Sequence, residues 1–260
     1  MQDLNVTLIQ AGLAWEDPES NRRQLGDILQ SLAPTDLVVL PEMFTTGFSI
    51  ASTAKAEAMD GPTVKWMRDQ AKSGEFVLTG SVKIIEDEHC YNRLIWVWPD
   101  GRLAHYDKRH LFRMAGEHER YTAGTDRVII DYLGWKILPQ VCYDLRFPVF
   151  SRNRDDYDLV IYVANWPAAR RSAWNHLLPA RAIENLSYCI GVNRVGRDGN
   201  DIDYAGDSAV VDFRGDYLVN MGHHASTGSA TLVAAELHRF REKFPAHRDA
   251  DTFELGKDSL

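Results

Sequence analysis

Three residues with complementary chemistry stand at the ends of three short apolar runs. Glu42 ends the run DLVVLPE, Lys108 ends RLAHYDK and Cys142 ends ILPQVC. A cysteine thiol becomes a strong nucleophile when a base or a positive charge promotes its ionisation. A carboxylate can act as that base, and an ammonium group can stabilise the oxyanion of a tetrahedral intermediate. The three residue types together therefore predict acyl transfer through a cysteine.

Side chains at strand ends can converge, because open α/β sheets bind ligands beyond the carboxyl ends of their strands. The backbone N–H of Tyr143, directly after the thiol, is expected to supply a second oxyanion donor. Each residue also has a structural interpretation: Cys142 as a core residue, Glu42 as a helix cap or arginine partner, and Lys108 as a solvated charge. From the residue types alone, both interpretations remain open.

The chain around these residues alternates between strand-like and helical patterns. Extended apolar runs bounded by turn residues are typical of buried strands, and apolar residues spaced three or four apart are typical of helices. This alternation predicts an α/β fold, and three more extended runs follow residue 187. The other expected strands are residues 4–10, 36–42, 75–82, 135–143 and 158–166.

Helices are expected over residues 18–33, 61–74 and 170–187, and Pro179 is expected to kink or divide the last of them. Pro-Asp-Gly between two extended runs predicts a hairpin over residues 93–109. Hairpins among alternating strands and helices predict one layered α/β domain with a mixed sheet.

The composition favours a soluble globular protein of the cytoplasm. The chain has 260 residues, of which 45% are hydrophobic and 25% charged, so it can bury one sizeable core. A formal net charge of −8 argues against nucleic acid or an anionic membrane as the main partner. No apolar run approaches the ~20 residues of a membrane span, and we see no signal peptide. The three cysteines (Cys90, Cys142 and Cys189) form no Cys-x-x-Cys pair, which fits a reducing compartment.

Other site chemistries have weaker support in the sequence. Nine histidines are scattered without the local signature of a cysteine–histidine hydrolase. The pair His223–His224 lacks the further ligands of a metal site, and no glycine-rich nucleotide-binding motif is present. We therefore expect no metal and no cofactor. A non-catalytic scaffold that binds a partner is an alternative, although such a scaffold has no need of the acid, the amine and the thiol together.

Three motifs resemble the signatures of the carbon–nitrogen hydrolases, the nitrilase superfamily. They are LPEMFTTGF, YDKRHLF and VCYDLRFP, and the resemblance extends from about residue 4 to residue 240. It implies that Glu42 is the general base, Lys108 the oxyanion-stabilising cation and Cys142 the nucleophile. It also implies a four-layer-forming α-β-β-α sandwich that associates as a homodimer or a larger homo-oligomer.

The family often has a further glutamate in the loop after the lysine, placed to orient it. The stretch RMAGEHERYTAGTD offers Glu117 and Glu119, and we favour Glu117 because of its distance to Gly124. We expect a single domain over residues 1–260, with its core over about 4–240 and a C-terminal helix and tail over 241–260.

Within the superfamily, HLFRMAGEHERYTAG, YNRLIWVWPDG and CYDLRFPVFSRN are most similar to bacterial omega-amidases. This implies hydrolysis of the terminal amide of 2-oxoglutaramate or 2-oxosuccinamate to ammonia and a 2-oxo acid. A nitrilase or an N-carbamoyl amidohydrolase is the alternative within the family.

Such a substrate carries a carboxylate, so a cation should line its site. Arg146 is the expected ligand, and Arg170–Arg171 offer further charge. Phe48 and Trp166 are expected to wall the substrate pocket, or else to pack the core.

Overall fold

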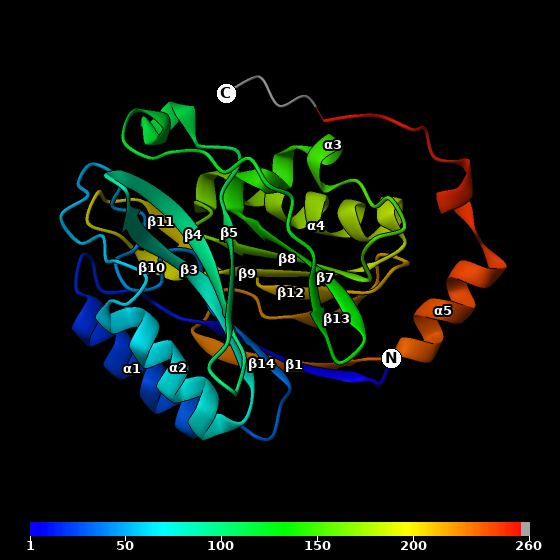
Figure 1. Cartoon of the computed structure of the whole chain (residues 1–260), viewed down its shortest axis with the longest axis horizontal. Helices are drawn as coiled ribbons and strands as arrows, with labels where there is room; N and C mark the ends of the chain where they lie inside the picture. The colour runs from blue at the N-terminus through cyan, green and yellow to red at the C-terminus, as the bar shows by residue number, and fades with distance from the viewer. Residues whose placement is uncertain (256–260) are drawn as a thin grey trace.

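The protein is built on two six-stranded β-sheets that lie face to face, as a computed structural model describing residues 1–255 shows (Figure 1). The first sheet is mixed, with β1, β2 and β3 parallel and the other pairs antiparallel. In spatial order its strands are β14 (Ser226–Leu232), β1 (Leu4–Gln10), β2 (Leu37–Val39), β3 (Val77–Glu86), β4 (His89–Val97) and β5 (Leu103–Asp107).

The second sheet is also mixed, with β7, β8 and β9 parallel. A separate two-stranded hairpin joins β10 (Val195–Arg197) to β11 (Asp203–Ala205). In spatial order the strands of the second sheet are β13 (Tyr217–Asn220), β12 (Ala209–Val211), β9 (Tyr188–Asn193), β8 (Leu159–Ala164), β7 (Trp135–Val141) and β6 (Ile130–Tyr132).

Helices cover the outer faces of both sheets. The helices α1 (Pro18–Gln30) and α2 (Pro62–Gly74) pack on the first sheet, and α4 (Arg171–Asn185) packs on the second. The expected four-layer α-β-β-α sandwich is therefore confirmed (Figure 1). The remaining helical segments are α3 (Pro148–Ser151), α5 (Ala234–Lys243) and the short 3₁₀ turns η1 (Arg113–Ala115), η2 (Glu117–Glu119), η3 (Cys142–Arg146), η4 (Ala168–Arg170) and η5 (Ala246–Asp249).

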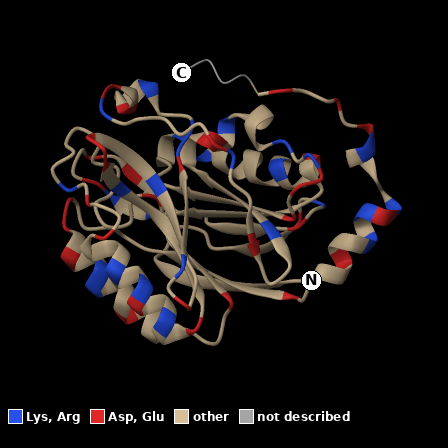
Figure 2. Cartoon of the chain, in the orientation of Figure 1, with Lys and Arg blue, Asp and Glu red and all other residues tan. Residues whose placement is uncertain are grey.

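Charged side chains of both signs are interspersed on the outer helices α1, α2 and α5 (Figure 2). Such mixing is usual for helix faces that point away from a core. Within residues 1–255, no helix is both long and apolar enough to span a membrane.

Strand alternation sorts the side chains of β3 between two environments. Val82 and Ile84 point toward the core beneath α1 and α2. Ser81 and Lys83 point to the opposite face, between the sheets, and are fully buried there. Both side chains form hydrogen bonds with the segment that follows β2.

The helix α4 differs from the expectation, because it runs without interruption through Pro179. Proline has no N–H to donate to the carbonyl four residues earlier, which is that of Asn175. The hydroxyl of Tyr217, on β13, donates to this carbonyl at 2.9 Å. A side chain from the neighbouring sheet thus replaces the missing helical bond, and the helix is not divided.

Two boundaries also differ from the expectation. The strand β2 covers only Leu37–Val39, so it ends three residues before Glu42. The C-terminal helix is α5 at Ala234–Lys243, not a segment within residues 241–260, and a one-turn 3₁₀ segment, η5, follows it. The last part of the predicted tail, residues 256–260, lies outside the described residues.

Candidate active site

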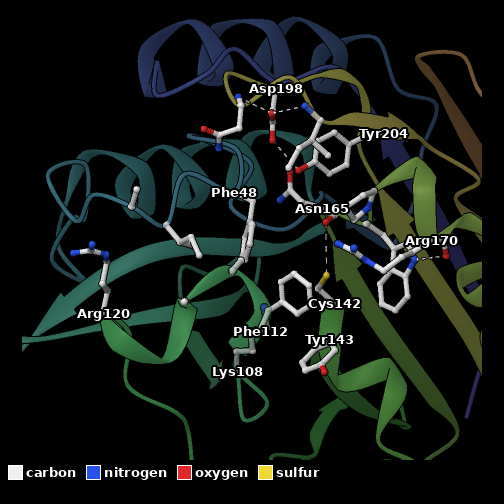
Figure 3. Close-up of a pocket in the computed structure, with 18 of the residues that line it drawn as sticks. Phe48, Lys108, Phe112, Arg120, Cys142, Tyr143, Asn165, Arg170, Asp198 and Tyr204 are labelled. Carbon is white, nitrogen blue, oxygen red and sulfur yellow. Dashed lines mark hydrogen bonds between the residues drawn. The ribbon is translucent and has the colours of Figure 1, made fainter.

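The structure brings together side chains from one edge of each sheet. In the first sheet β2 and β5 run in the same direction, so Glu42 and Lys108 leave the sheet at the same edge. Cys142 directly follows β7 of the facing sheet. Figure 3 shows Lys108 and Cys142 at one end of a common pocket.

The ammonium group of Lys108 is fully buried between two carboxylates. Its Nζ donates to Oε1 of Glu42 at 3.0 Å and to both oxygens of Glu117, at 3.1 and 2.9 Å. Of the two glutamates that the sequence offers, Glu117 contacts Lys108, whereas Glu119 is exposed at the rim of the pocket.

Further donors fix the two carboxylates. Nδ2 of Asn92, on β4, donates to Oε1 of Glu42 at 2.7 Å and to Oε1 of Glu117 at 3.2 Å. The backbone N–H of Asn165 donates to Oε2 of Glu42 at 2.7 Å. The backbone N–H of Phe112 donates to Oε2 of Glu117 at 2.6 Å. Every carboxylate oxygen of the pair thus accepts at least one hydrogen bond, as buried charges require.

The loop that carries Glu117 leaves the sheet after Lys108 and returns beside it. The N–H of Gly124 donates to the carbonyl of Lys108 at 3.0 Å. A Cβ atom on Gly124 would lie 2.2 Å from the carbonyl oxygen of Asp107, so only glycine permits this approach.

Burial and charge act in opposite directions on this cluster. Burial alone would lower the pKa of Lys108, but the charges of Glu117 and Glu42 outweigh it and raise the pKa above its ordinary value. Burial raises the pKa of Glu117, and the charge of Lys108 opposes that rise. We infer that the lysine keeps its proton throughout the physiological pH range.

Cys142 is held in a strained backbone conformation at the start of η3. Its φ of 46° lies in the left-handed region, which is costly for a residue with a Cβ atom. The residue is 9% exposed, and its Sγ lies 3.9 Å from the carbonyl oxygen of Asn165. Burial, followed by the charge of Glu42, raises the pKa of Cys142 well above its ordinary value. The resting group is therefore a neutral thiol beside a carboxylate.

The turn after Cys142 is tied to the loop after Lys108 by Asp144. This buried carboxylate accepts from the N–H of Val141 at 2.9 Å, the N–H of His110 at 3.0 Å and the hydroxyl of Tyr106 at 2.8 Å. Asp144, in the turn after β7, thus contacts both β5, through Tyr106, and the loop after it, through His110.

A cavity of about 270 Å³ opens beside Cys142. Phe48, Tyr143 and Trp166 line it, and the ring centroid of Phe48 lies 5.2 Å from Nζ of Lys108. Trp166 is only 3% exposed and belongs to the main core as well, so it both packs the core and walls the cavity.

The three candidate arginines have different surroundings. Arg146 and Arg170 line the cavity, each with its guanidinium over an aromatic ring. Arg171 instead forms a two-pronged ion pair with Asp207 and does not line the cavity, so the expectation of further charge from this residue is wrong.

Sequence reasoning missed Asn92, Asp144 and Asn165. Asn92 had one weak signal, a polar residue within the apolar strand YNRLIWV. Asp144 and Asn165 follow strands, as the predicted residues do, but neither residue type identifies a positioning role by itself.

Within residues 1–255, no group of three His, Cys, Asp or Glu side chains is arranged to hold a metal ion.

Residues 5–242 match the model of the carbon-nitrogen hydrolase family. The chain belongs to this family.

Proteins with similar sequences match this chain over nearly its whole length. Omega-amidase YafV of Escherichia coli K12 is 48% identical over 256 residues, which cover 98% of this chain and all of that protein. The 2-oxoglutaramate amidase of Bacillus subtilis is 28% identical, with 94% of this carbon-nitrogen hydrolase and 96% of the relative covered. A solved structure, XC1258 from Xanthomonas campestris, is a CN-hydrolase superfamily protein with an arsenic adduct in its active site. It is 52% identical, with a TM-score of 0.97 over 98% of this chain and 100% of that chain.

Proposed function

We propose that this carbon-nitrogen hydrolase cleaves the terminal amide of a small 2-oxo-dicarboxylic acid monoamide, such as 2-oxoglutaramate or 2-oxosuccinamate. The products are ammonia and the dicarboxylic 2-oxo acid. The observation that carries this proposal is the buried Glu42–Lys108–Glu117 cluster beside the thiol of Cys142, at the end of a cavity lined by Arg146. Likeness to an omega-amidase of E. coli at 48% identity supports the choice of substrate.

In the proposed first step, Sγ of Cys142 attacks the amide carbonyl carbon while Glu42 accepts the thiol proton. This coupling is needed because burial raises the pKa of the thiol and keeps it protonated. Nζ of Lys108 and the backbone N–H of Tyr143 stabilise the oxyanion of the tetrahedral intermediate. Its collapse breaks the C–N bond, Glu42 returns the proton to the leaving nitrogen, and ammonia departs from a thioester on Cys142.

In the proposed second step, Glu42 takes a proton from a water molecule, which attacks the thioester carbon. The C–S bond breaks, the thiolate recovers a proton, and the new carboxylic acid leaves. Glu117 serves as a positioning residue, since it holds Lys108 with two contacts of 3.1 Å or less. Arg146 binds the substrate carboxylate, and Phe48 and Trp166 wall its carbon chain.

The cellular setting belongs to the same proposal. We place the enzyme in the cytoplasm, as one domain over residues 1–260 that functions as a homodimer or a larger homo-oligomer. The chain's acidic balance, with a net charge of −8, supports a small-molecule substrate rather than nucleic acid as the main partner.

An ammonia-release screen with purified protein tests the function. We expect 2-oxoglutaramate and 2-oxosuccinamate to be hydrolysed with higher kcat/KM than a short aliphatic nitrile or an N-carbamoyl amino acid. Faster release from the nitrile or the N-carbamoyl compound would instead assign the protein to another activity of the family. Absence of hydrolysis with all four compounds would favour a non-catalytic scaffold.

A further inference from the structure

Within residues 1–255, Arg146 and Arg170 line the cavity and form no ion pair with an acidic residue. Resting on the proposed function, we propose that Arg146 and Arg170 act as a cationic pair that binds the 2-oxo acid end of the substrate. The same pair rejects the amide of the corresponding 2-amino acid. Arg170 is thereby assigned as a specificity-determining residue.

Each guanidinium of the pair is held by an aromatic ring instead of a carboxylate. That of Arg146 lies 4.9 Å from the ring centroid of Trp166, and that of Arg170 lies 5.0 Å from the ring centroid of Phe112. Within residues 1–255, neither side chain donates a hydrogen bond or forms an ion pair. Because a guanidinium carries five N–H donors, the pair offers many unused donors to a ligand.

The aromatic supports fix the pair in place without neutralising it. Trp166 is nearly fully buried, and its Nε1 donates to the backbone carbonyl of Arg170 at 2.8 Å. The guanidinium of Arg146 therefore packs on the face of the same indole ring whose N–H binds the main chain of Arg170. A pre-positioned cation loses little freedom when a ligand binds.

The other charged groups of the cavity have other partners or lie at its rim. The charge of Lys108 is already engaged by the carboxylates of Glu42 and Glu117. The carboxylate of Asp198 accepts two backbone N–H groups and a tyrosine hydroxyl. Glu119 and Arg120 are exposed at the rim, and Figure 3 shows Arg120 on the other side of the pocket from Arg170. None of these carboxylates forms a hydrogen bond or ion pair with Arg146 or Arg170, so within residues 1–255 both guanidiniums stay available to an anionic ligand.

The 2-oxo acid group suits this cationic pair. Its carboxylate and adjacent keto oxygen are all hydrogen-bond acceptors, and a planar guanidinium can engage two acceptors at once. L-Glutamine has the same carbon chain, but an ammonium group replaces the keto oxygen. Two guanidiniums repel that ammonium group, so the pair selects by repulsion as well as by attraction.

Neighbouring arginines supply a matched comparison. Arg170→Met removes one charge of the pair, whereas Arg171→Met removes a charge that is paired with Asp207 outside the cavity. The substrates are 2-oxoglutaramate, L-glutamine and glutaramate, the monoamide that has neither the oxo nor the amino group. For each substrate kcat and KM are measured by ammonia release, and the Tm of each variant is recorded.

In Arg170→Met we expect KM for 2-oxoglutaramate to rise by about 10- to 100-fold, with a smaller change in kcat. Activity on L-glutamine is expected not to fall, so the preference for the oxo acid shrinks at least about tenfold. For glutaramate, which has the carboxylate alone, KM is expected to rise less than for 2-oxoglutaramate. Arg171→Met is expected to keep the wild-type preference.

Two results would overturn the inference. An Arg170→Met variant with unchanged preference among the three substrates, or with an equal loss on all of them, would remove Arg170 from substrate selection. In that case the proposed function stands, because the wild type still hydrolyses 2-oxoglutaramate. A wild-type protein that leaves 2-oxoglutaramate intact would overturn the proposed function and this inference together.

Discussion

At the scale of single residues, one ammonium group faces two carboxylates, and all three side chains are fully buried. Lys108 is the counter-charge of both Glu42 and Glu117. Removing the lysine leaves two buried negative charges, whereas neutralising one glutamate leaves a matched pair. Removal of the lysine should therefore mainly lower stability, whereas neutralisation of Glu42 should mainly lower activity.

We predict that Lys108→Met lowers the free energy of unfolding by about 3–5 kcal/mol, because breaking a buried ion pair leaves charge uncompensated. Glu42→Gln keeps its hydrogen-bonding shape and should lower it by only about 1 kcal/mol. The same Glu42→Gln change should lower kcat by about 10²- to 10⁴-fold, the usual contribution of a general base. Denaturant unfolding and ammonia release check both quantities. An active Glu42→Gln variant that unfolds as readily as Lys108→Met would mark Glu42 as structural.

The three cysteines should differ in reactivity. Cys142 lines the cavity beside Glu42, whereas Cys90 is 5% exposed and Cys189 is fully buried, both within strands. We predict that iodoacetamide modifies Cys142 first, as peptide mapping would show. The raised pKa of Cys142 further predicts that thiolate absorbance is absent near pH 7 in the resting protein. Equal labelling of the three thiols would contradict this ranking.

At the scale of elements, the sequence pattern predicts site residues at the ends of strands but not site residues within buried strands. Apolar runs that end in a potent side chain predicted Glu42, Lys108 and Cys142 as neighbours of one site, and the structure brings them together. The polar residues on β3 and β4 escaped prediction. A buried strand between two packed layers has no exposed face, so its pattern does not show which face is polar.

Lys83 is the least expected of these buried polar residues. Its buried Nζ donates to the carbonyls of Ser49 and Ser52 and to the hydroxyl of Ser49, so it fixes the loop that carries Phe48. Burial lowers the pKa of Lys83 to about 8, although the charges of Glu16 and Cys90 oppose the shift. A neutral amine has one N–H fewer to donate. The wall of the cavity should therefore loosen as pH rises through about 8.

We predict that KM of the wild type rises above pH 8 and that Lys83→Met has a raised KM without this pH step. Lys72→Met, on the exposed face of α2, is the control and should keep the step. Because the folded pKa lies below the unfolded value of 10.5, the unfolded chain binds the extra proton between the two. The free energy of unfolding from this group should thus increase with pH in that window. A wild-type KM that stays flat through the window would contradict the role of Lys83.

At the scale of the whole molecule, two sheets meet to form the site, and neither sheet contains it alone. Patterns along the chain predicted the α/β alternation, and the family motifs predicted the four layers. Two sets of hydrogen bonds were not predictable: those of Asp144 to the first sheet, and that of the Tyr217 hydroxyl to helix α4. Both depend on partners 34 to 42 residues away in the sequence. Such pairings follow from packing rather than from local pattern.

The C-terminal helix is fixed to the second sheet by Arg241. Its guanidinium donates to the carbonyls of Leu186 and Tyr157 and pairs with Asp158 at 2.7 Å. We predict that Arg241→Met lowers the free energy of unfolding by about 2–3 kcal/mol and leaves kcat and KM unchanged. The exposed Arg239→Met is the matched control on the same helix and should change neither. An Arg241→Met variant with wild-type stability would show that α5 is held by other contacts.

The central claim is that Cys142 forms the bond to the substrate. The most direct test compares ammonia release from 2-oxoglutaramate by the wild type and by Cys142→Ala, with Tm measured for both. We predict that Cys142→Ala folds normally and that its kcat falls by about 10⁴-fold or more, the scale of loss when a nucleophile is removed. A folded Cys142→Ala protein that still releases ammonia at the wild-type rate would contradict it.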